Sequence, residues 1–148
     1  TGILEYTKDE NGLAVVMGHE IAHAIARHGN ERMSKAIAAQ MGGVALSVAL
    51  MNQSTQTQEL FKEAYGISSG LSGLAFSRRN ELESDKLGLV FMHLAGYDAT
   101  KAPDFWVRMT QNKQQIPAFL STHPSGDKRI EEIRSFLASE KFQKYTSK

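Results

Sequence analysis

The sequence has no cysteine and only three prolines among its 148 residues. Without cysteine the chain has no disulfide scaffold, no thiolate zinc site and no cysteine nucleophile. The compartment stays open, because cysteine-free chains suit both the cytosol and the periplasm. The prolines, at positions 103, 117 and 124, all lie in the last third of the chain. The first hundred residues can therefore form helices that no proline interrupts.

The chain also lacks an excess of charge of either sign and a long apolar run. It has 17 Lys and Arg against 16 Asp and Glu, a formal net charge of +1, which gives no indication of nucleic-acid binding. Its longest apolar run, Met41–Met51, is 11 residues long, against the roughly 20 that cross a bilayer. We expect this run to be a buried helical segment. The alternative is a surface that contacts a membrane or a partner protein.

Length and composition indicate one globular domain over residues 1–148. The chain is 41% hydrophobic and 22% charged, which is ordinary for a folded protein and argues against disorder. It begins at Thr1 with no charged and then apolar leader, so we expect a processed protein or an excised piece.

The hydrophobic pattern predicts a mainly α fold with one short strand at Thr1–Tyr6. Asp9 is the expected N-cap of the first helix, and His28–Gly29 its expected end. The last eight residues, rich in lysine, are expected to fray. Further helices are expected at about 31–51, at 81–94 with an end at Gly96, from Asp98 or Thr100 to Met109, and around 130–137. A helical stretch broken by glycines 66, 70 and 73 is expected before residue 78. Loops are expected at 52–58 and 116–127.

Residues 19–23 read His-Glu-Ile-Ala-His and carry the clearest chemical signal. On a helix, positions i and i+4 share a face, so His19 and His23 can reach one metal ion, and imidazole nitrogens suit Zn²⁺. Glu20 lies beside that ion and can take a proton from a water that the ion activates. Composition alone predicts roughly 0.01 such patterns in a chain of this kind. The motif therefore indicates a catalytic zinc site.

A catalytic zinc needs a third protein ligand. The metzincin pattern is excluded, because Gly29 stands where that pattern places its third histidine and His28 is one residue out of register. The remaining scheme takes a glutamate from a later helix, and Glu81 is the candidate. Asp85 shares its face and can accept a hydrogen bond from His19. A Glu-x-x-x-Asp pair arises by chance about 0.36 times in such a chain, so alone it is a weak signal.

Taken together, these segments resemble a known family of zinc metallopeptidases. The family comprises the CAAX prenyl proteases and the HtpX-type, OMA-type and BepA-type proteases, and the chain is most similar to the soluble BepA/OMA-like branch. Order and spacing agree from about residue 1 to 134, with Ser84 where the family usually has alanine. The matching segments are 18–23 (Gly-His-Glu-Ile-Ala-His), 26–28 (Ala-Arg-His), 77–85 (Ser-Arg-Arg-Asn-Glu-Leu-Glu-Ser-Asp), 95–98 (Ala-Gly-Tyr-Asp), 121–125 (Ser-Thr-His-Pro-Ser) and 129–130 (Arg-Ile).

The resemblance implies a zincin-like fold of the gluzincin type that lacks the strands the family carries upstream. It implies one Zn²⁺ per chain, held by His19, His23 and Glu81, with Glu20 as general base. His123 is expected at the mouth of the site, either as an oxyanion stabiliser or as a fourth zinc ligand that holds the enzyme latent. Arg129 is a further candidate for contact with the oxyanion or the substrate.

The expected function is zinc-dependent endoproteolysis of unfolded or misassembled proteins. The resemblance places such an enzyme in the bacterial periplasm or cell envelope, with proteins of an assembly machinery as possible partners. Under the alternative interpretation of the Met41–Met51 run given above, that run is the candidate for peripheral membrane contact. The alternative is a latent or inactive zinc-stabilised chaperone or binding module, in which His123 stays on the metal. Glu20 disfavours this alternative, because a purely structural zinc site needs no base.

Overall fold

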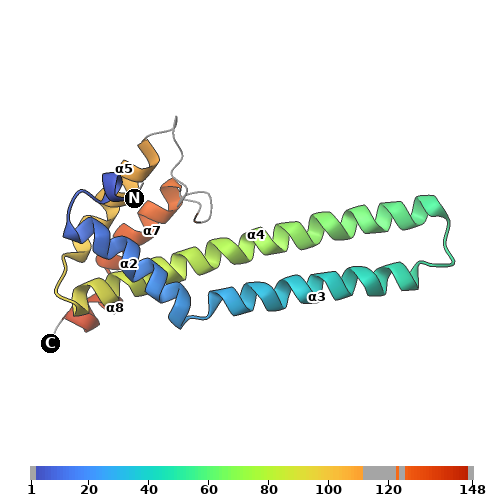
Figure 1. Cartoon of the computed structure of the whole chain (residues 1–148), viewed down its shortest axis with the longest axis horizontal. Helices are drawn as coiled ribbons and strands as arrows, with labels where there is room; N and C mark the ends of the chain where they lie inside the picture. The colour runs from blue at the N-terminus through green and yellow to red at the C-terminus, as the bar shows by residue number, and fades with distance from the viewer. Residues whose placement is uncertain (1–2, 112–122, 124–125, 147–148) are drawn as a thin grey trace. The chain divides into compact units, whose positions relative to one another are not determined.

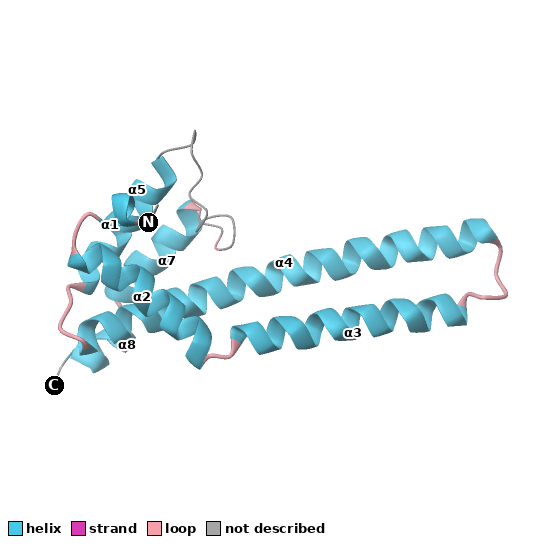
Figure 2. Cartoon of the chain, in the orientation of Figure 1, coloured by secondary structure: helices cyan, strands magenta, loops and turns pink. Residues whose placement is uncertain are grey.

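The structure, a computed structural model, describes residues 3–111, 123 and 126–146. These residues form helices and loops, and no strand occurs among them (Figure 2). The chain divides into two compact units. The core unit comprises residues 1–26 and 80–148, and the hairpin unit comprises residues 27–79. The long helix α4, Thr55–Leu94, contributes to both.

Local signals explain where the helices of the core unit begin and end. Before α2, Asp9 is extended, and its carboxylate accepts a hydrogen bond from the Gly12 N–H at 2.8 Å. After α4, Gly96 has a φ of 83°, a left-handed conformation that glycine adopts without strain. The core unit contains α1 (Leu4–Thr7), α2 (Glu10–Ile25), the end of α4, a short 3₁₀ helix η1 (Ala99–Lys101), α5 (Ala102–Gln111), α7 (Asp127–Leu137) and α8 (Glu140–Thr146).

The hydrophobic core lies among α2, α4, α5 and α7. Helix α5 contributes its largest members, Phe105, Trp106 and Met109, each at most 1% exposed. Ile133 on α7 and Leu89 on α4 pack in the same cluster. Burial of these side chains, at about 1.5–3 kcal/mol each, fixes the helices that carry the polar residues described below.

Two glycines let α2 and α4 approach closely. A Cβ atom on Gly88 would lie 3.0 Å from the carbonyl carbon of Gly18, so no larger residue fits without movement. Gly18 precedes His19, and Gly88 follows Asp85 by one turn of α4. The contact therefore sets the position of His19 against α4.

The hairpin unit contains α3 (His28–Ala49) and the first part of α4, which run antiparallel on either side of a short loop (Figure 1). Small residues of α3, Ala39, Gly42 and Gly43, lie against Tyr65 of α4. Tyr65 lies beside Gly42 and donates a hydrogen bond from its hydroxyl to the carbonyl of Ala39 at 2.8 Å.

Several sequence predictions are wrong. Leu4–Tyr6 lie in α1, not in a strand, and residues 1–2 lie outside the described part. The first helix ends at Ile25, because Arg27 takes the left-handed conformation expected of Gly29, and His28 begins α3. Glycines 66, 70 and 73 do not interrupt α4.

Two predictions of burial and exposure are also wrong. The Met41–Met51 run is not buried: Met41 is 67% and Val48 is 62% exposed, and the other residues of the run are exposed or half-buried. The lysine-rich tail instead forms α8, which Phe142, only 7% exposed, attaches to the core. Of the predicted loop 116–127, the residues other than 123, 126 and 127 lie outside the described part, and Asp127 already belongs to α7.

Candidate metal centre

His19 and His23 project from the same face of α2. Their Nε2 atoms lie 3.1 Å apart, as the spacing of four residues on a helix predicts. His19 is 1% exposed, and the side chain of His23 is 13% exposed. The pair thus has one nearly enclosed member and one that reaches toward solvent.

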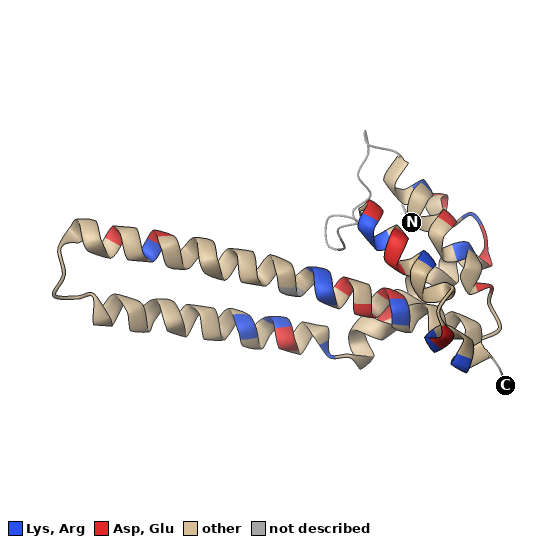
Figure 3. Cartoon of the chain, turned by 180° about the vertical axis from the view of Figure 1, so that it is seen from behind, with Lys and Arg blue, Asp and Glu red and all other residues tan. Residues whose placement is uncertain are grey.

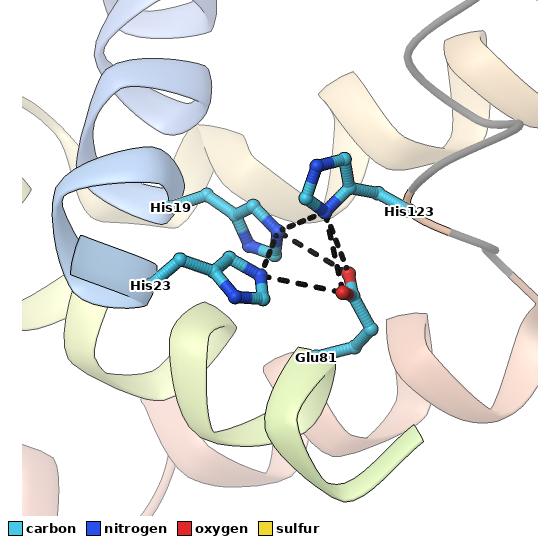
Figure 4. A group of neighbouring side chains, drawn as sticks. All are labelled: His19, His23, Glu81 and His123. Atoms are coloured by element: carbon cyan, nitrogen blue, oxygen red, sulfur yellow. Dashed lines mark hydrogen bonds and ion pairs between the residues drawn. The ribbon is translucent and has the colours of Figure 1, made fainter. Parts of the chain in front are cut away.

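Glu81 approaches both histidines from α4. Its Oε2 lies 3.3 Å from Nε2 of His19, and its Oε1 lies 3.3 Å from Nε2 of His23. His123 completes the group: its Nδ1 lies 3.2 Å from each carboxylate oxygen of Glu81 and 3.2 Å from Nε2 of His19 (Figure 4). One ligand atom from each of the four residues lies within 4.8 Å of all the others.

The chemistry of this donor set fits a metal ion. Three imidazole nitrogens and a carboxylate point at one small volume, and a neutral imidazole can offer a lone pair there. Nitrogen and carboxylate ligands in a group of three or four are typical of Zn²⁺. His19, His23 and Glu81 can therefore hold such an ion, with His123 near enough to join them.

Asp85 orients the more buried histidine. Its Oδ1 lies 3.0 Å from Nδ1 of His19, on the side of the ring away from the converging nitrogens. Burial lowers the pKa of His19, but the hydrogen bonds with Asp85 and Glu81 and the Asp85 charge outweigh this and raise the pKa above its ordinary value. A hydrogen bond at Nδ1 leaves Nε2 to face the other donors.

Arg129, from α7, connects the two carboxylates. Its Nε and Nη2 contact the oxygens of Asp85 at 2.7 and 2.8 Å, and its Nη1 lies 3.1 Å from Oε2 of Glu81. Its guanidinium carbon also lies 4.0 Å from the ring centroid of Trp106. The guanidinium is thus enclosed by its contacts with these two carboxylates and Trp106, which suit a positioning role; contact with the oxyanion or the substrate, for which Arg129 was a candidate, stays a prediction.

The Glu81 carboxylate stays ionised in this setting. Burial raises its pKa, but hydrogen bonds with His123, His19 and His23 and the charge of Arg129 outweigh burial. The net effect holds the pKa of Glu81 far below its ordinary value. An anionic ligand is therefore available over the whole range of physiological pH.

Glu20 lies at the rim of the group. Its side chain is 47% exposed, and its Oε1 lies 3.3 Å from Nε2 of His123. It is next to His19 in sequence but on the solvent side of α2, where a carboxylate can reach a water molecule.

Trp106 also lies beside the group, and no motif in the sequence pointed to it. Its ring lies edge-on to His19, with centroids 5.9 Å apart, and it is 1% exposed. Trp106 is the one tryptophan of the chain, and this was the only feature of the sequence that could have drawn attention to it. His93, on α4, lies away from this group and contacts the ring of Phe142 at a centroid distance of 6.1 Å.

Comparison with known proteins gives consistent results. The sequence profile of peptidase family M48 matches residues 1–137. The mitochondrial metalloendopeptidase OMA1 of Schizosaccharomyces pombe is 38% identical, over 99% of this chain and 42% of that protein. The protein of the same name from Arabidopsis thaliana is 34% identical, over 87% of this chain and 25% of its own length.

A bacterial relative is more distant. The β-barrel assembly-enhancing protease of Yersinia pestis is 28% identical, over 91% of this chain and 29% of that protein. The chain spans less than half the length of each of these three relatives. No solved structure matches it.

Proposed function

The chain belongs to peptidase family M48, and from that premise we propose that it is a zinc-dependent endopeptidase acting on unfolded or misassembled proteins. One observation carries the proposal: His19, His23 and Glu81 converge within ligand distance of one another, with Glu20 beside them at the rim. A purely structural metal site does not need the Glu20 carboxylate at its rim, whereas peptide hydrolysis requires a base there.

His19, His23 and Glu81 would hold the ion, and Asp85 would keep the ring of His19 in the orientation that presents Nε2. A bound Zn²⁺ supplies a Lewis acid that polarises the peptide carbonyl and lowers the pKa of water toward 7. Glu20 takes a proton from the attacking water and delivers it to the amine that leaves. Arg129 keeps the carboxylates of Asp85 and Glu81 in place through its buried contacts.

The position of His123 supports a second candidate function. Its Nδ1 lies as close to the carboxylate of Glu81 as the ligand histidines do, so a closed site with four protein ligands is available. Such a site leaves no open position for water and suits a latent enzyme or a zinc-stabilised binding module. If His123 leaves the metal, its imidazolium can instead stabilise the developing oxyanion.

Hydrolysis of casein tests the proposal. Zinc-loaded chain is expected to cleave casein, a chelator to abolish cleavage, and added zinc to restore it. Absence of cleavage from a chain that binds one zinc would contradict an active endopeptidase and favour the closed site.

His123→Ala separates the two roles of that histidine. If His123 closes the site, the variant gains activity on casein. If His123 stabilises the oxyanion, the variant loses roughly 100-fold or more in kcat, as removal of one oxyanion donor does elsewhere. Zinc content measured in parallel shows whether the three remaining ligands suffice.

The compartment and partners belong to the same proposal. The relatives are named for the mitochondrion and for β-barrel assembly. We propose that the chain acts in the bacterial cell envelope, together with proteins of an assembly machinery. This proposal rests on the similarity to the β-barrel assembly-enhancing proteases. Exposure of Met41–Met51 supports the interpretation of this run as a surface for a membrane or a partner protein.

A further inference from the structure

Trp106 lies against two different groups of the metal centre at once. Its ring is edge-on to the imidazole of His19, with centroids 5.9 Å apart and an angle of 70° between the planes. On another side, the guanidinium carbon of Arg129 lies over the ring, 4.0 Å from its centroid. The tryptophan is only 1% exposed, so it makes both contacts away from water. One rigid side chain therefore contacts a proposed zinc ligand and the cation behind it.

The cation is needed because two acids are buried together. Acidic residues gather on the end of α4 that belongs to the core unit (Figure 3). Glu81 and Asp85 are one turn apart on that helix and at most 5% exposed. Like charges at this spacing repel each other, and burial strengthens the repulsion. The guanidinium of Arg129 contacts both carboxylates and offsets their charge.

The contacts of Arg129 require its guanidinium to stay in one orientation. Nε and Nη2 must reach the oxygens of Asp85 at 2.7 and 2.8 Å while Nη1 reaches Oε2 of Glu81 at 3.1 Å. A long arginine side chain has many rotamers, and fixing one of them costs entropy. A guanidinium over the face of a tryptophan is attracted to the ring, and more strongly where water is excluded. The ring of Trp106 thus gives the guanidinium a surface that holds it between the two acids.

The second contact of Trp106 restricts the ring of His19. The hydrogen bond with Asp85 fixes one point of the imidazole, Nδ1, and packing must fix the rest. The cavity bordered by His19, Asp85 and Trp106 has a volume of about 10 Å³. This is at the lower limit for a single water molecule, so the imidazole has little room to turn. A smaller side chain in place of Trp106 would enlarge this cavity.

From these contacts we propose that Trp106 is a positioning residue of the metal centre. Its ring holds the guanidinium of Arg129 between Asp85 and Glu81, and it holds the imidazole of His19 with Nε2 toward the other ligands. This inference rests on the metal site of the proposed function but not on proteolysis. It is therefore tested by zinc binding, without substrate.

Two substitutions of Trp106 separate positioning from simple packing. Trp106→Leu is expected to weaken zinc affinity about tenfold in a metal-competition titration, as loss of a group that supports a ligand does elsewhere. Trp106→Phe is expected to stay within about threefold of the unaltered chain, because phenylalanine keeps an aromatic face for the guanidinium. Unchanged affinity in Trp106→Leu would overturn the proposal.

Met109→Ala is the matched control. Met109 lies one turn further along α5 and is as deeply buried, at 0% exposed, so its truncation also removes core packing. This variant is expected to unfold at a lower urea concentration but to keep the zinc affinity of the unaltered chain. A loss of affinity equal to that of Trp106→Leu would show that any loss of core packing has the same effect, and would overturn the specific role.

A double substitution tests whether Trp106 acts through Arg129. Arg129→Lys keeps a cation but removes the planar fork that reaches both acids. In this background Trp106→Leu is expected to weaken zinc affinity by a factor clearly smaller than in the unaltered chain, because the two residues are coupled. An equal factor in both backgrounds would contradict the action through Arg129.

The emission of Trp106 gives an independent readout, because it is the one tryptophan of the chain. Zinc is expected to change this emission up to one equivalent per chain, since the metal binds the imidazole that the indole ring contacts. Emission that does not respond, in a chain that competition shows to bind zinc, would overturn the contact. A chain that binds zinc as expected but leaves casein intact would overturn the proposed proteolysis alone, whereas normal zinc affinity in Trp106→Leu would overturn only this inference.

Discussion

At the residue scale, the site depends on polar contacts that run from His19 through Asp85 to Arg129. Each group is at most 6% exposed, so each needs its partner. Removing one member leaves another buried without its hydrogen bond, which costs more than the bond itself contributes. This asymmetry makes two substitutions informative.

Asp85→Ala is expected to weaken zinc affinity roughly 10–100-fold, because His19 loses the acceptor that fixes its ring. A metal-competition titration measures this. Glu83→Ala is the control, since Glu83 lies on the same turn of α4 but is exposed. Equal affinities for the two variants would remove Asp85 from this role.

Arg129→Gln is expected to lower the free energy of unfolding by about 3–5 kcal/mol, because it leaves the Asp85 carboxylate buried without its cation. Urea denaturation of the metal-free chain measures this. Asp85→Asn in the same chain should recover part of the loss, since it removes that charge. Strict additivity of the two substitutions would show that the pair is not coupled.

At the element scale, the approach of α2 to α4 decides whether the ligands meet. Local signals predicted the start of α2 and the end of α4: the Asp9 cap and the Gly96 terminus are confirmed. The distance between the helices has no local signal, because it depends on two glycines 70 positions apart. The same limit applies to Trp106 and Arg129, whose contacts with the site arise only from packing.

Gly88→Ala is expected to destabilise the chain by about 1–3 kcal/mol and to weaken zinc binding, because its Cβ meets the backbone of Gly18 and His19 at 3.0 Å. Gly73→Ala, on the same helix, meets nothing within 4 Å. It should stabilise the chain by roughly 0.5–1 kcal/mol. Thermal unfolding and metal titration of both variants test this, and an unaffected Gly88→Ala chain would show that the approach is not tight.

Short or atypical elements were the ones that the sequence pattern misassigned. Leu4–Tyr6 is too brief for periodicity to separate a helix from a strand, and Ile3 and Tyr6 pack on the core from a helical turn. The tail forms α8 because one aromatic residue, Phe142, is buried. A single anchoring contact of this kind leaves little trace in composition.

At the scale of the whole molecule, the two units differ in what their sequences reveal. The residues proposed as zinc ligands all belong to the core unit, where the motif spacing suggested the two histidines and the family resemblance suggested Glu81. The hairpin unit was expected to bury its apolar run, because periodicity shows that a face is apolar but not what covers it. Met41 and Val48 of that run are instead more than 60% exposed.

Zinc content and casein hydrolysis, measured together on Glu20→Gln, test most directly whether Glu20 is the base of a zinc endopeptidase. Glutamine keeps the size of the side chain but cannot accept the proton, and Glu20 is not among the proposed ligands. This variant is expected to bind one zinc per chain, as the unaltered protein does, and to lose hydrolysis by at least 100-fold. Full hydrolysis by this variant would contradict the assignment of Glu20 as the base and, with it, the proposed mechanism.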